Sequence, residues 1–323
     1  MRRTLVISLL ALITLAPVSV SVAAARSPVR VGVSDQSPAM FASPFFQQLK
    51  VKRTRYFVPS DVMQDAVERA KARAFVTAAR AAGVSTLLHI STTDLRNNRG
   101  KIVAPATYRR NVGRIVAYFR PLGVRDFGSW NEENHKSQET WNHVGNAVSY
   151  FKSMYSAVRR RCPTCAVVGL DLLDQAGVDR YIRSFYARLS RTWRTRLKVV
   201  GIHNYSDVNR NRSSGTRTII TTARRYNRRV KFWFTETGAV ATFGGSFPFS
   251  EARQASRIKN MFTFASRYKA HGVERVYSYN LFGIENGTAC GSRCRFDAGL
   301  LDPDGTPRPV FGVFKLKLRN YSR

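Results

Sequence analysis

Short runs of apolar residues recur along the chain, and segments with apolar residues at helical spacing separate them. The runs are rich in Val, Ile, Phe and Tyr and end in Gly, Asn, Asp or Ser, which is typical of β-strands. Eight strands are predicted in this way, over residues 29–35, 51–58, 84–91, 124–131, 166–173, 197–205, 231–237 and 275–282.

The segments between these strands predict amphipathic helices. The clearest helix covers residues 61–82, with Ser60 as its N-cap and Gly83 as its stop. Further helices are predicted wherever apolar residues recur at helical spacing, over residues 106–120, 144–160, 251–270 and 309–318.

The regular alternation of strand and helix indicates one α/β domain. Eight strand–helix units average about 37 residues each, which fits an eight-fold β/α barrel. A doubly wound open sheet is the alternative, but it usually has a glycine-rich phosphate-binding turn after its first strand. The sequence GVSDQSPAM at 32–40 contains no such turn. We therefore predict a single (β/α)8 barrel domain, a TIM barrel, over residues 26–323.

The first 25 residues differ from the rest of the chain. Arginines at positions 2 and 3 precede an apolar run that ends in alanines at 23–25. This is the pattern of a secretory signal peptide that is cleaved after residue 25. The run is nearly long enough to be a membrane anchor, but Pro17 and the Ala-x-Ala ending favour cleavage. We expect a secreted protein with no membrane span after cleavage.

The composition is strongly basic, with 53 Lys and Arg against 20 Asp and Glu and a formal net charge of +33. Such a charge attracts nucleic acid, anionic lipid or acidic polysaccharide. The basic residues are scattered and no nucleic-acid-binding motif accompanies them, so we do not expect nucleic acid as the partner. An acidic polysaccharide remains an open alternative.

The four cysteines form two close pairs, Cys162 with Cys165 and Cys290 with Cys294. In an exported chain, two local disulfides are favoured over thiolate ligands. A four-thiolate zinc site is the alternative, but it would need the two distant pairs to meet, and no histidine stands beside either pair. We expect neither a metal nor an organic cofactor.

Polar residues gather at the predicted C-terminal ends of the strands, where barrel enzymes place their active sites. Glu132 ends the fourth strand, and Glu236 follows Phe232 and Phe234 on one face of the seventh. Two carboxylates that face each other can perform retaining glycoside hydrolysis, one as acid/base and the other as nucleophile. The acid must hold a proton at rest, so we expect its pKa to be raised.

The residues around these two carboxylates resemble a known group of enzymes. The sequence WNEEN at 130–134 resembles the Asn-Glu-Pro signature of clan A glycoside hydrolases, and WFTETG at 233–238 resembles their strand-seven nucleophile motif. The tail at 297–314 is similar to the segment after strand eight in families 5 and 39. The resemblance implies a retaining β-glycosidase with Glu132 as acid/base and Glu236 as nucleophile.

The same resemblance implies a set of binding and positioning residues. IHNYSD at 202–207 is similar to a His-x-Tyr motif in which the tyrosine positions the nucleophile, and Arg55 matches an arginine that bonds the nucleophile. The asparagine before the acid would bond the sugar 2-hydroxyl. The expected substrate-binding residues are Asn131, Arg55, His203, Tyr205, His89 and Asn280.

Some positions keep more than one interpretation. Glu133 stands where proline is usual in the clan, so the acid could be Glu132 or Glu133. Asn280 lies near the place of a tryptophan that floors the sugar site, so the sugar and linkage stay open. His89 could be a satisfied histidine at the barrel mouth, and Asp171 is better interpreted as a helix cap.

Three functions therefore follow from the sequence. The first is a secreted retaining glycoside hydrolase that acts as a monomer on a polysaccharide or oligosaccharide, which could be acidic. The others are a non-catalytic carbohydrate-binding barrel and a basic protein that binds an anionic cell-wall polymer. The presence of both carboxylates favours the first.

Phe243, Phe247 and Phe249, after the nucleophile strand, could form a sugar-stacking wall or pack in a lid or the core.

Overall fold

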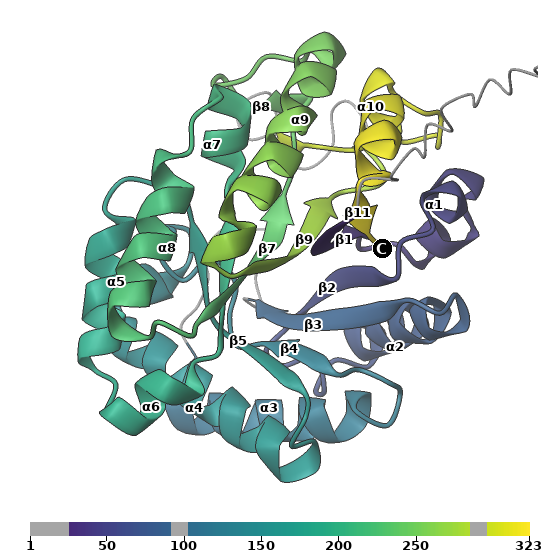
Figure 1. Cartoon of the computed structure of the whole chain (residues 1–323). Coiled ribbons are helices and arrows are strands. Elements are labelled where there is room, and N and C mark those ends of the chain that lie inside the picture. Colours follow the sequence, from purple (N-terminus) through teal and green to yellow (C-terminus); the bar gives the residue numbers. More distant parts are fainter. Residues whose placement is uncertain (1–25, 92–102, 285–295) are drawn as a thin grey trace, which may run out of the picture.

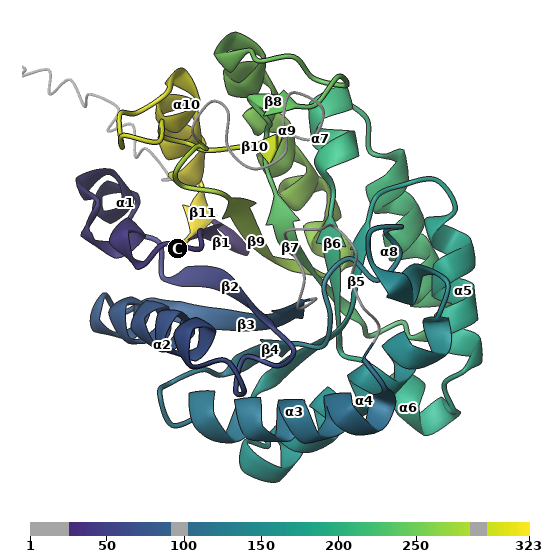
Figure 2. The same cartoon turned by 180° about the vertical axis from the view of Figure 1, so that it is seen from behind.

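Eight parallel strands line the centre of the molecule, and helices surround them (Figures 1 and 2). The computed structural model describes residues 26–91, 103–284 and 296–323. The barrel strands are β1 (Ser27–Ser34), β2 (Arg53–Pro59), β3 (Ser85–Ser91), β4 (Asp126–Gly128), β5 (Ala166–Leu173), β6 (Val199–His203), β7 (Lys231–Thr237) and β9 (Val273–Tyr279). Each coincides with a predicted strand, and the predicted TIM barrel is confirmed.

The outer layer is helical. It consists of α1 (Pro44–Leu49), α2 (Ala66–Ala81), α3 (Pro105–Phe119), α4 (Val144–Arg161), α5 (Val178–Ala187), α6 (Arg191–Arg196), α7 (Tyr205–Arg210), α8 (Ser214–Tyr226), α9 (Glu251–Tyr268) and α10 (Pro309–Leu318). The five predicted helices are present, but the sequence analysis named none between residues 174 and 230, where α5 to α8 lie.

The strands follow one another around the barrel in the order β11-β1-β9-β7-β6-β5-β4-β3-β2, where β11 (Tyr321–Ser322) is a short edge strand. Among the described residues β1 and β2 share no backbone ladder, yet they lie side by side (Figure 1). The amide of Arg55 donates to Ser34 Oγ at 3.3 Å. A Cβ on Gly32 would lie 2.4 Å from the carbonyl oxygen of Arg53. Close contact at a glycine therefore closes the barrel at this seam.

The barrel interior is filled in layers. Alternate residues of the strands point inward and form a small apolar cluster of Leu87, Val168, Val199, Trp233 and Tyr277. The guanidinium of Arg275 lies 3.6 Å from the centre of the Trp233 ring and binds Asp126 at 2.5 Å. A larger apolar cluster fills the space between the strands and the helices.

Helix α2 begins later than predicted, and its N-cap is Asp65 rather than Ser60. Asp65 Oδ1 accepts hydrogen bonds from the amides of Val67 at 2.8 Å and Glu68 at 3.0 Å. Ser60 is fully buried, and a turn separates it from the helix. Serine and aspartate are both strong N-cap residues, so the type of residue alone could not choose between them.

One of the two predicted disulfides is confirmed. Cys162 and Cys165 form a disulfide between the end of α4 and the turn into β5. Cys290, Cys294 and the predicted signal peptide lie outside the described residues. Among the described helices, none is both long enough and apolar enough to cross a bilayer.

The position of the α2 cap can be tested by substitution. We expect Asp65→Ala to lower the free energy of unfolding by about 0.5–2 kcal/mol, because two amides at the helix start lose their acceptor. Ser60→Ala is the matched control and should cost less, since the buried Ser60 hydroxyl has no hydrogen-bond partner among the described residues. Urea unfolding curves measure both variants. A larger loss for Ser60→Ala would contradict this cap.

Candidate active site

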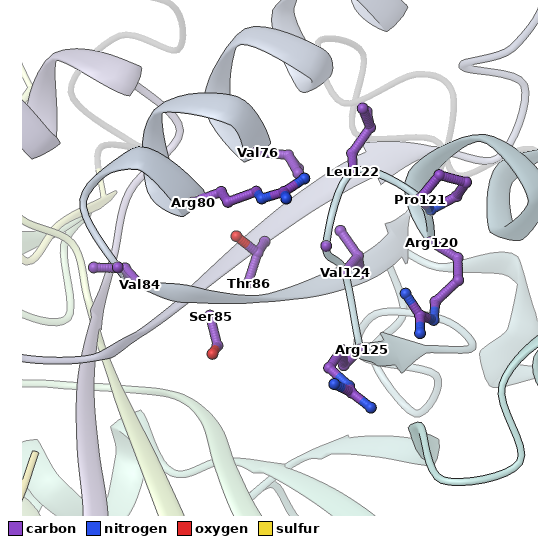
Figure 3. A pocket seen from close by; sticks show the side chains of 12 residues that line it. Val76, Arg80, Val84, Ser85, Thr86, Arg120, Pro121, Leu122, Val124 and Arg125 are labelled. Carbon is purple, nitrogen blue, oxygen red and sulfur yellow. The ribbon is translucent and has the colours of Figure 1, made fainter.

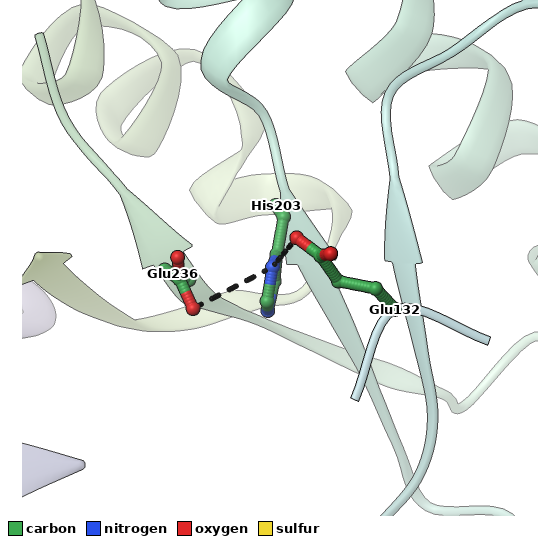
Figure 4. A group of neighbouring side chains, drawn as sticks. All are labelled: Glu132, His203 and Glu236. Carbon is green, nitrogen blue, oxygen red and sulfur yellow. Dashed lines mark hydrogen bonds and ion pairs between the residues drawn. The ribbon is translucent and has the colours of Figure 1, made fainter. Parts of the chain in front are cut away.

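Glu132 and Glu236 face each other at the C-terminal ends of β4 and β7, with His203 between them (Figure 4). An oxygen of each carboxylate and a nitrogen of His203 all lie within 4.8 Å of one another. Glu132 adopts a left-handed backbone conformation with φ of 50°. That conformation costs a residue other than glycine about 1 kcal/mol or more and is concentrated at functional sites.

Glu133 points away from this pair. Its side chain is fully buried, and Oε2 accepts a hydrogen bond of 2.6 Å from the amide of Asp171 on β5. Burial and the nearby charge of Asp171 raise the pKa of Glu133 well above its ordinary value. Of the two adjacent glutamates, Glu132 is therefore the one that faces Glu236.

Arg55 and Tyr205 hold the carboxylate of Glu236. Arg55 Nη1 lies 2.7 Å from Glu236 Oε2, and the Tyr205 hydroxyl donates to Oε1 at 3.1 Å. Burial and the charge of Glu236 raise the pKa of Tyr205 well above its ordinary value, so the hydroxyl keeps its proton and donates it. Arg55 Nη2 also donates to Asn131 Oδ1 at 2.5 Å. Arg55 therefore links Glu236 to the residue that precedes Glu132.

A fully buried carboxylate, Asp171, lies among two histidines and an arginine of the site. Its Oδ2 is 2.8 Å from His203 Nε2, 3.6 Å from His89 Nε2 and 3.8 Å from Arg55 Nη2. Thr235 Oγ1 donates a short hydrogen bond to Oδ1. Burial raises the pKa of Asp171, but the two imidazoles and the guanidinium outweigh it, and the net pKa is lowered. Asp171 is therefore an anion inside the barrel.

The helix-cap interpretation of Asp171 was wrong, because the residue lies within β5 and points into the barrel. Gly201 on the neighbouring β6 makes this possible, since a Cβ there would lie 1.8 Å from Asp171 Oδ1. Asp35, directly after β1, joins two segments of the backbone and is not the N-cap of the helix that follows, which is Ser37. Its oxygens accept hydrogen bonds from the amides of residues 36, 37, 281 and 282, which join the segments after β1 and β9.

His89 is neutral and supports the loop that carries the acid. Burial, which Arg55 and His203 reinforce, lowers its pKa to about 3. Its Nδ1 accepts a hydrogen bond from Arg55 Nε at 3.2 Å, so the proton lies on Nε2, which is 2.6 Å from the carbonyl oxygen of Trp130. The contact fixes the backbone two residues before Glu132. It matches the interpretation of His89 as a satisfied histidine at the barrel mouth.

His203 is a cation in this site. Burial alone would lower its pKa, but the charges of Asp171 and Glu236, with a hydrogen bond to Glu132, raise it to about 10. Its Nδ1 lies 2.9 Å from Glu132 Oε1 and 3.7 Å from Glu236 Oε2. The imidazolium thus contacts three carboxylates at once.

The expected pKa of Glu132 was wrong in direction. Burial raises it, but the hydrogen bond and charge of His203, together with His135, outweigh burial and lower the pKa of Glu132. At rest the shared proton therefore lies on His203 Nδ1 rather than on Glu132. The sequence could not reveal this, because the deciding charge is that of Asp171 on another strand.

Tyr279 and Phe296, which the sequence analysis did not select, form an aromatic cluster with Tyr205 and Phe243 near Glu236. The Tyr205 ring meets Phe296 edge to face at 4.9 Å, and Tyr279 stacks on Phe296 at 6.3 Å. Phe243 meets Phe296 at 5.5 Å and keeps 46% of its surface exposed. Phe243 and Phe296 belong to the antiparallel pair of β8 (Thr242–Phe243) and β10 (Phe296–Asp297). Alternation with the inward-facing Tyr277 could have indicated Tyr279.

In the part of the chain that the structure describes, Asn280 forms no hydrogen bond with Glu132 or Glu236. Its Nδ2 donates to the carbonyl of Phe282, and its Oδ1 is buried without a hydrogen-bond partner among the described residues. The residue that ends β9 beside Glu236 is Tyr279, and Glu236 adds to burial in raising the pKa of its hydroxyl. Phe247 packs under Arg210 and Arg253 instead of facing the site.

The spacing of Glu132, His203 and Glu236 would also suit a metal ion. The charges of the site oppose this use. A metal would have to displace the proton of His203, whose pKa is raised to about 10, and compete with Arg55, which lies 2.7 Å from Glu236. The arrangement therefore favours a carboxylate pair that works with protein cations.

No protein-family model and no curated protein matches this chain. Solved structures resemble it over nearly its whole length. A glucosidase from Croceicoccus marinus has a TM-score of 0.67 and 14% identity, over 91% of this chain and 67% of that one. A GH39 enzyme from Xanthomonas axonopodis pv. citri has a TM-score of 0.65 and 14% identity, over 92% and 67%. A GH5_18 protein from Bifidobacterium longum subsp. infantis has a TM-score of 0.65 and 14% identity, over 92% and 80%.

The (β/α)8 barrel fold of this chain is shared by these solved structures. At these identities the likeness concerns the fold alone, and it agrees with the clan resemblance of the WNEEN and WFTETG motifs. The roles of individual residues have to come from the geometry of the site.

The role of Asp171 can be tested through the titration of His203. We expect Asp171→Asn to lower the pKa of His203 from about 10, because the imidazolium loses its buried counter-ion. Imidazole chemical shifts in NMR spectra follow the titration directly. Asp126→Asn, which removes another carboxylate of the barrel interior, is the control and should leave it unchanged. Equal pKa values in wild type and Asp171→Asn would refute this role.

The same ion pair predicts how stability depends on pH. The pKa of His203 is raised in the folded protein from 6.5 to about 10. The stabilisation it provides is therefore fully present below pH 6.5 and is lost as the pH rises toward 10. The free energy of unfolding of the wild type should fall over this range, and Asp171→Asn should show a smaller fall. Urea unfolding at a series of pH values measures both.

Proposed function

We propose that the protein is a secreted retaining glycoside hydrolase that cleaves a β-type bond in a polysaccharide or oligosaccharide. The observation that carries the proposal is the pair of carboxylates, Glu132 and Glu236, with oxygens within 4.8 Å of each other. Carboxyl groups about 5–5.5 Å apart serve retaining hydrolysis, whereas inverting enzymes separate them by about 6.5–9.5 Å to admit a water.

In the first step Glu236 acts as the nucleophile. One of its oxygens forms a bond to the anomeric carbon while the bond from that carbon to the leaving sugar breaks. Glu132, in its acid form, gives its proton to the leaving oxygen. Arg55 and Tyr205 hold Glu236 in one orientation, which reduces the freedom lost on reaching the transition state.

In the second step Glu132 acts as a base. It takes a proton from water, the water oxygen bonds to the anomeric carbon, and the bond to Glu236 breaks. Asn131 lies beside Glu132 and is held by Arg55, so its amide is placed to bond the sugar 2-hydroxyl.

His203 supplies the proton for the first step. Its Nδ1 holds a proton 2.9 Å from Glu132 Oε1, and transfer across that contact gives Glu132 its acid form. Asp171 contacts the opposite nitrogen and keeps the imidazole in place during the transfer. The proton returns when Glu132 has taken one from water.

The comparisons support a β-linked substrate without defining the sugar. Proteins with similar folds are described with Manb1-4GlcNAc and with xylobiose, at TM-scores of 0.59 and 0.61. The exposed Phe243, which contacts Phe296 beside the site, could stack on such a sugar. Export follows from the signal-peptide pattern of the first 25 residues, and N-terminal sequencing of the mature protein tests it.

Turnover should depend on both facing carboxylates. Neutral and acidic polysaccharides and aryl β-glycosides are incubated with the wild type, and released reducing ends or phenol are measured. We expect Glu236→Ala to abolish turnover and Glu132→Gln to reduce it by roughly 10²–10⁴-fold on substrates that need protonation of the leaving group. Sodium azide should restore turnover of an activated aryl glycoside by Glu236→Ala, because the small anion replaces the missing nucleophile.

Glu133→Gln is the matched control for this experiment. Glutamine has nearly the shape of glutamate and carries no charge, and burial disfavours the charged form of Glu133, so the variant should fold and keep turnover comparable to the wild type. Loss of turnover in Glu133→Gln with retention in Glu132→Gln would reverse the assignment of the acid. Glycan binding without turnover by the wild type on every substrate would indicate a binding barrel instead.

A further inference from the structure

A cavity of about 350 Å³ lies at the opposite end of the barrel from the carboxylate pair. It is formed where helices α2 and α3 end and strands β3 and β4 begin (Figure 3). In a β/α barrel this end normally serves stability, because the catalytic residues lie at the other end of the strands. A polar cavity here is therefore not part of the proposed active site.

Three arginines line the cavity, namely Arg80, Arg120 and Arg125, and no Asp or Glu is among the lining residues. The Arg80 side chain extends over Thr86, and Arg120 lies on the other side of the cavity beside Val124 (Figure 3). Within the described ranges none of the three guanidiniums has an ion-pair or hydrogen-bond partner. Arg120 Nε is also shielded from solvent, so its donor has neither a protein acceptor nor free access to water.

Helix ends explain only part of this charge. Carbonyl groups at the C-termini of α2 and α3 carry partial negative charge, which Arg80 and Arg120 offset. Arg125 lies on neither helix, and Lys52 Nζ lies close by, 3.7 Å from where a Cβ on Gly83 would stand. Like charges around one concavity repel each other, and a bound anion would relieve that repulsion.

The lining also indicates the kind of anion. Guanidinium groups bind carboxylates and phosphates through paired hydrogen bonds. Ser85 and Thr86 add hydroxyl groups, and the Thr86 hydroxyl makes no hydrogen bond to any described residue. The lining contains no aromatic residue, whereas sites for single-stranded nucleic acid stack bases on aromatic rings. The volume falls in the range of sites for small polar ligands.

We propose that this cavity binds a carboxylate-bearing sugar unit of an acidic polysaccharide. Arg80, Arg120 and Arg125 hold the carboxylate, and the hydroxyls of Ser85 and Thr86 meet the sugar hydroxyls. The site holds the polymer at the end of the barrel away from Glu132 and Glu236. It would function whether or not the protein cleaves that polymer.

Calorimetric titration with an oligogalacturonate of six units tests the proposal. All proteins carry Glu236→Gln so that the probe is not cleaved. The cavity variant combines Arg80→Gln, Arg120→Gln and Arg125→Gln, and we expect it to bind at least about tenfold more weakly than its parent, because each arginine supplies charge-assisted hydrogen bonds. Binding of a neutral oligosaccharide of the same length should not differ between the two.

The matched control removes the same charge from positions on α2 and α3 outside the cavity, through Arg73→Gln, Arg109→Gln and Arg114→Gln. The affinity of this control for the oligogalacturonate should lie within about twofold of that of its parent, because salt screens the interactions of charges on the exposed surface. An equal loss in both triple variants, or no loss in the cavity variant, would overturn the proposal. Arg125→Gln alone carries the test if the cavity variant does not fold.

A six-nucleotide single-stranded DNA, titrated in parallel, distinguishes the alternative source of the anion. We expect it to bind the parent more weakly than the oligogalacturonate and to lose little affinity in the cavity variant. Tighter binding of the DNA, with the larger loss in the cavity variant, would assign the cavity to phosphate and overturn the sugar acid. The three arginine substitutions are also made in a protein that keeps Glu236. We expect this variant to turn over an aryl β-glycoside at the rate of the wild type.

Discussion

The buried carboxylate of Asp171 is the interaction on which the rest of the site depends. It lies within 4 Å of His203, His89 and Arg55, and each of these three contacts a different part of the carboxylate pair or its loop. This single buried anion compensates the charges of His203 and Arg55, which would otherwise repel each other, while His89 beside it is neutral. With Asp171 neutral, the pKa of His203 would lose the largest contribution that raises it. The proton shared by His203 and Glu132 would then shift toward Glu132.

The backbone of the barrel is adapted to this anion. Gly201 leaves space for Asp171 Oδ1, and Gly128 leaves space for the His89 ring, since a Cβ there would lie 2.3 Å from the imidazole. Inward positions of neighbouring strands normally carry bulky apolar side chains in a TIM barrel. In this barrel, Gly128 and Gly201 lie beside the polar side chains of His89 and Asp171 in the layer nearest the carboxylate pair. The apolar cluster around Trp233 fills the layer further from that pair.

The distribution of charge separates the two ends of the molecule. The chain carries a net charge of +33, yet the end of the barrel with the carboxylate pair gathers carboxylates that are matched by buried cations. The opposite end has unmatched arginines around a cavity. If both sites act on one acidic polymer, the cavity would raise the local concentration of polymer around the barrel without contributing to bond cleavage.

The sequence by itself determined the barrel and the two carboxylates. The periodicity of a strand is a local property, so it can be recognised eight times in the sequence without knowledge of the tertiary structure. Glu132 and Glu236 fall at strand ends, which a parallel barrel must bring together. The same reasoning could not choose between Glu132 and Glu133. Only the tertiary structure decided that, because the deciding contact joins Glu133 to the amide of Asp171 on β5.

Tertiary structure alone also decided where the proton of the site lies. The pKa of Glu132 depends on His203, and that of His203 depends on Asp171 and Glu236, which come from four different segments of the chain. The energy of interaction between two charges depends on the distance between them. For residues from different segments, no local sequence pattern gives that distance. The sequence therefore fixes which groups can titrate, and folding fixes which of them are charged.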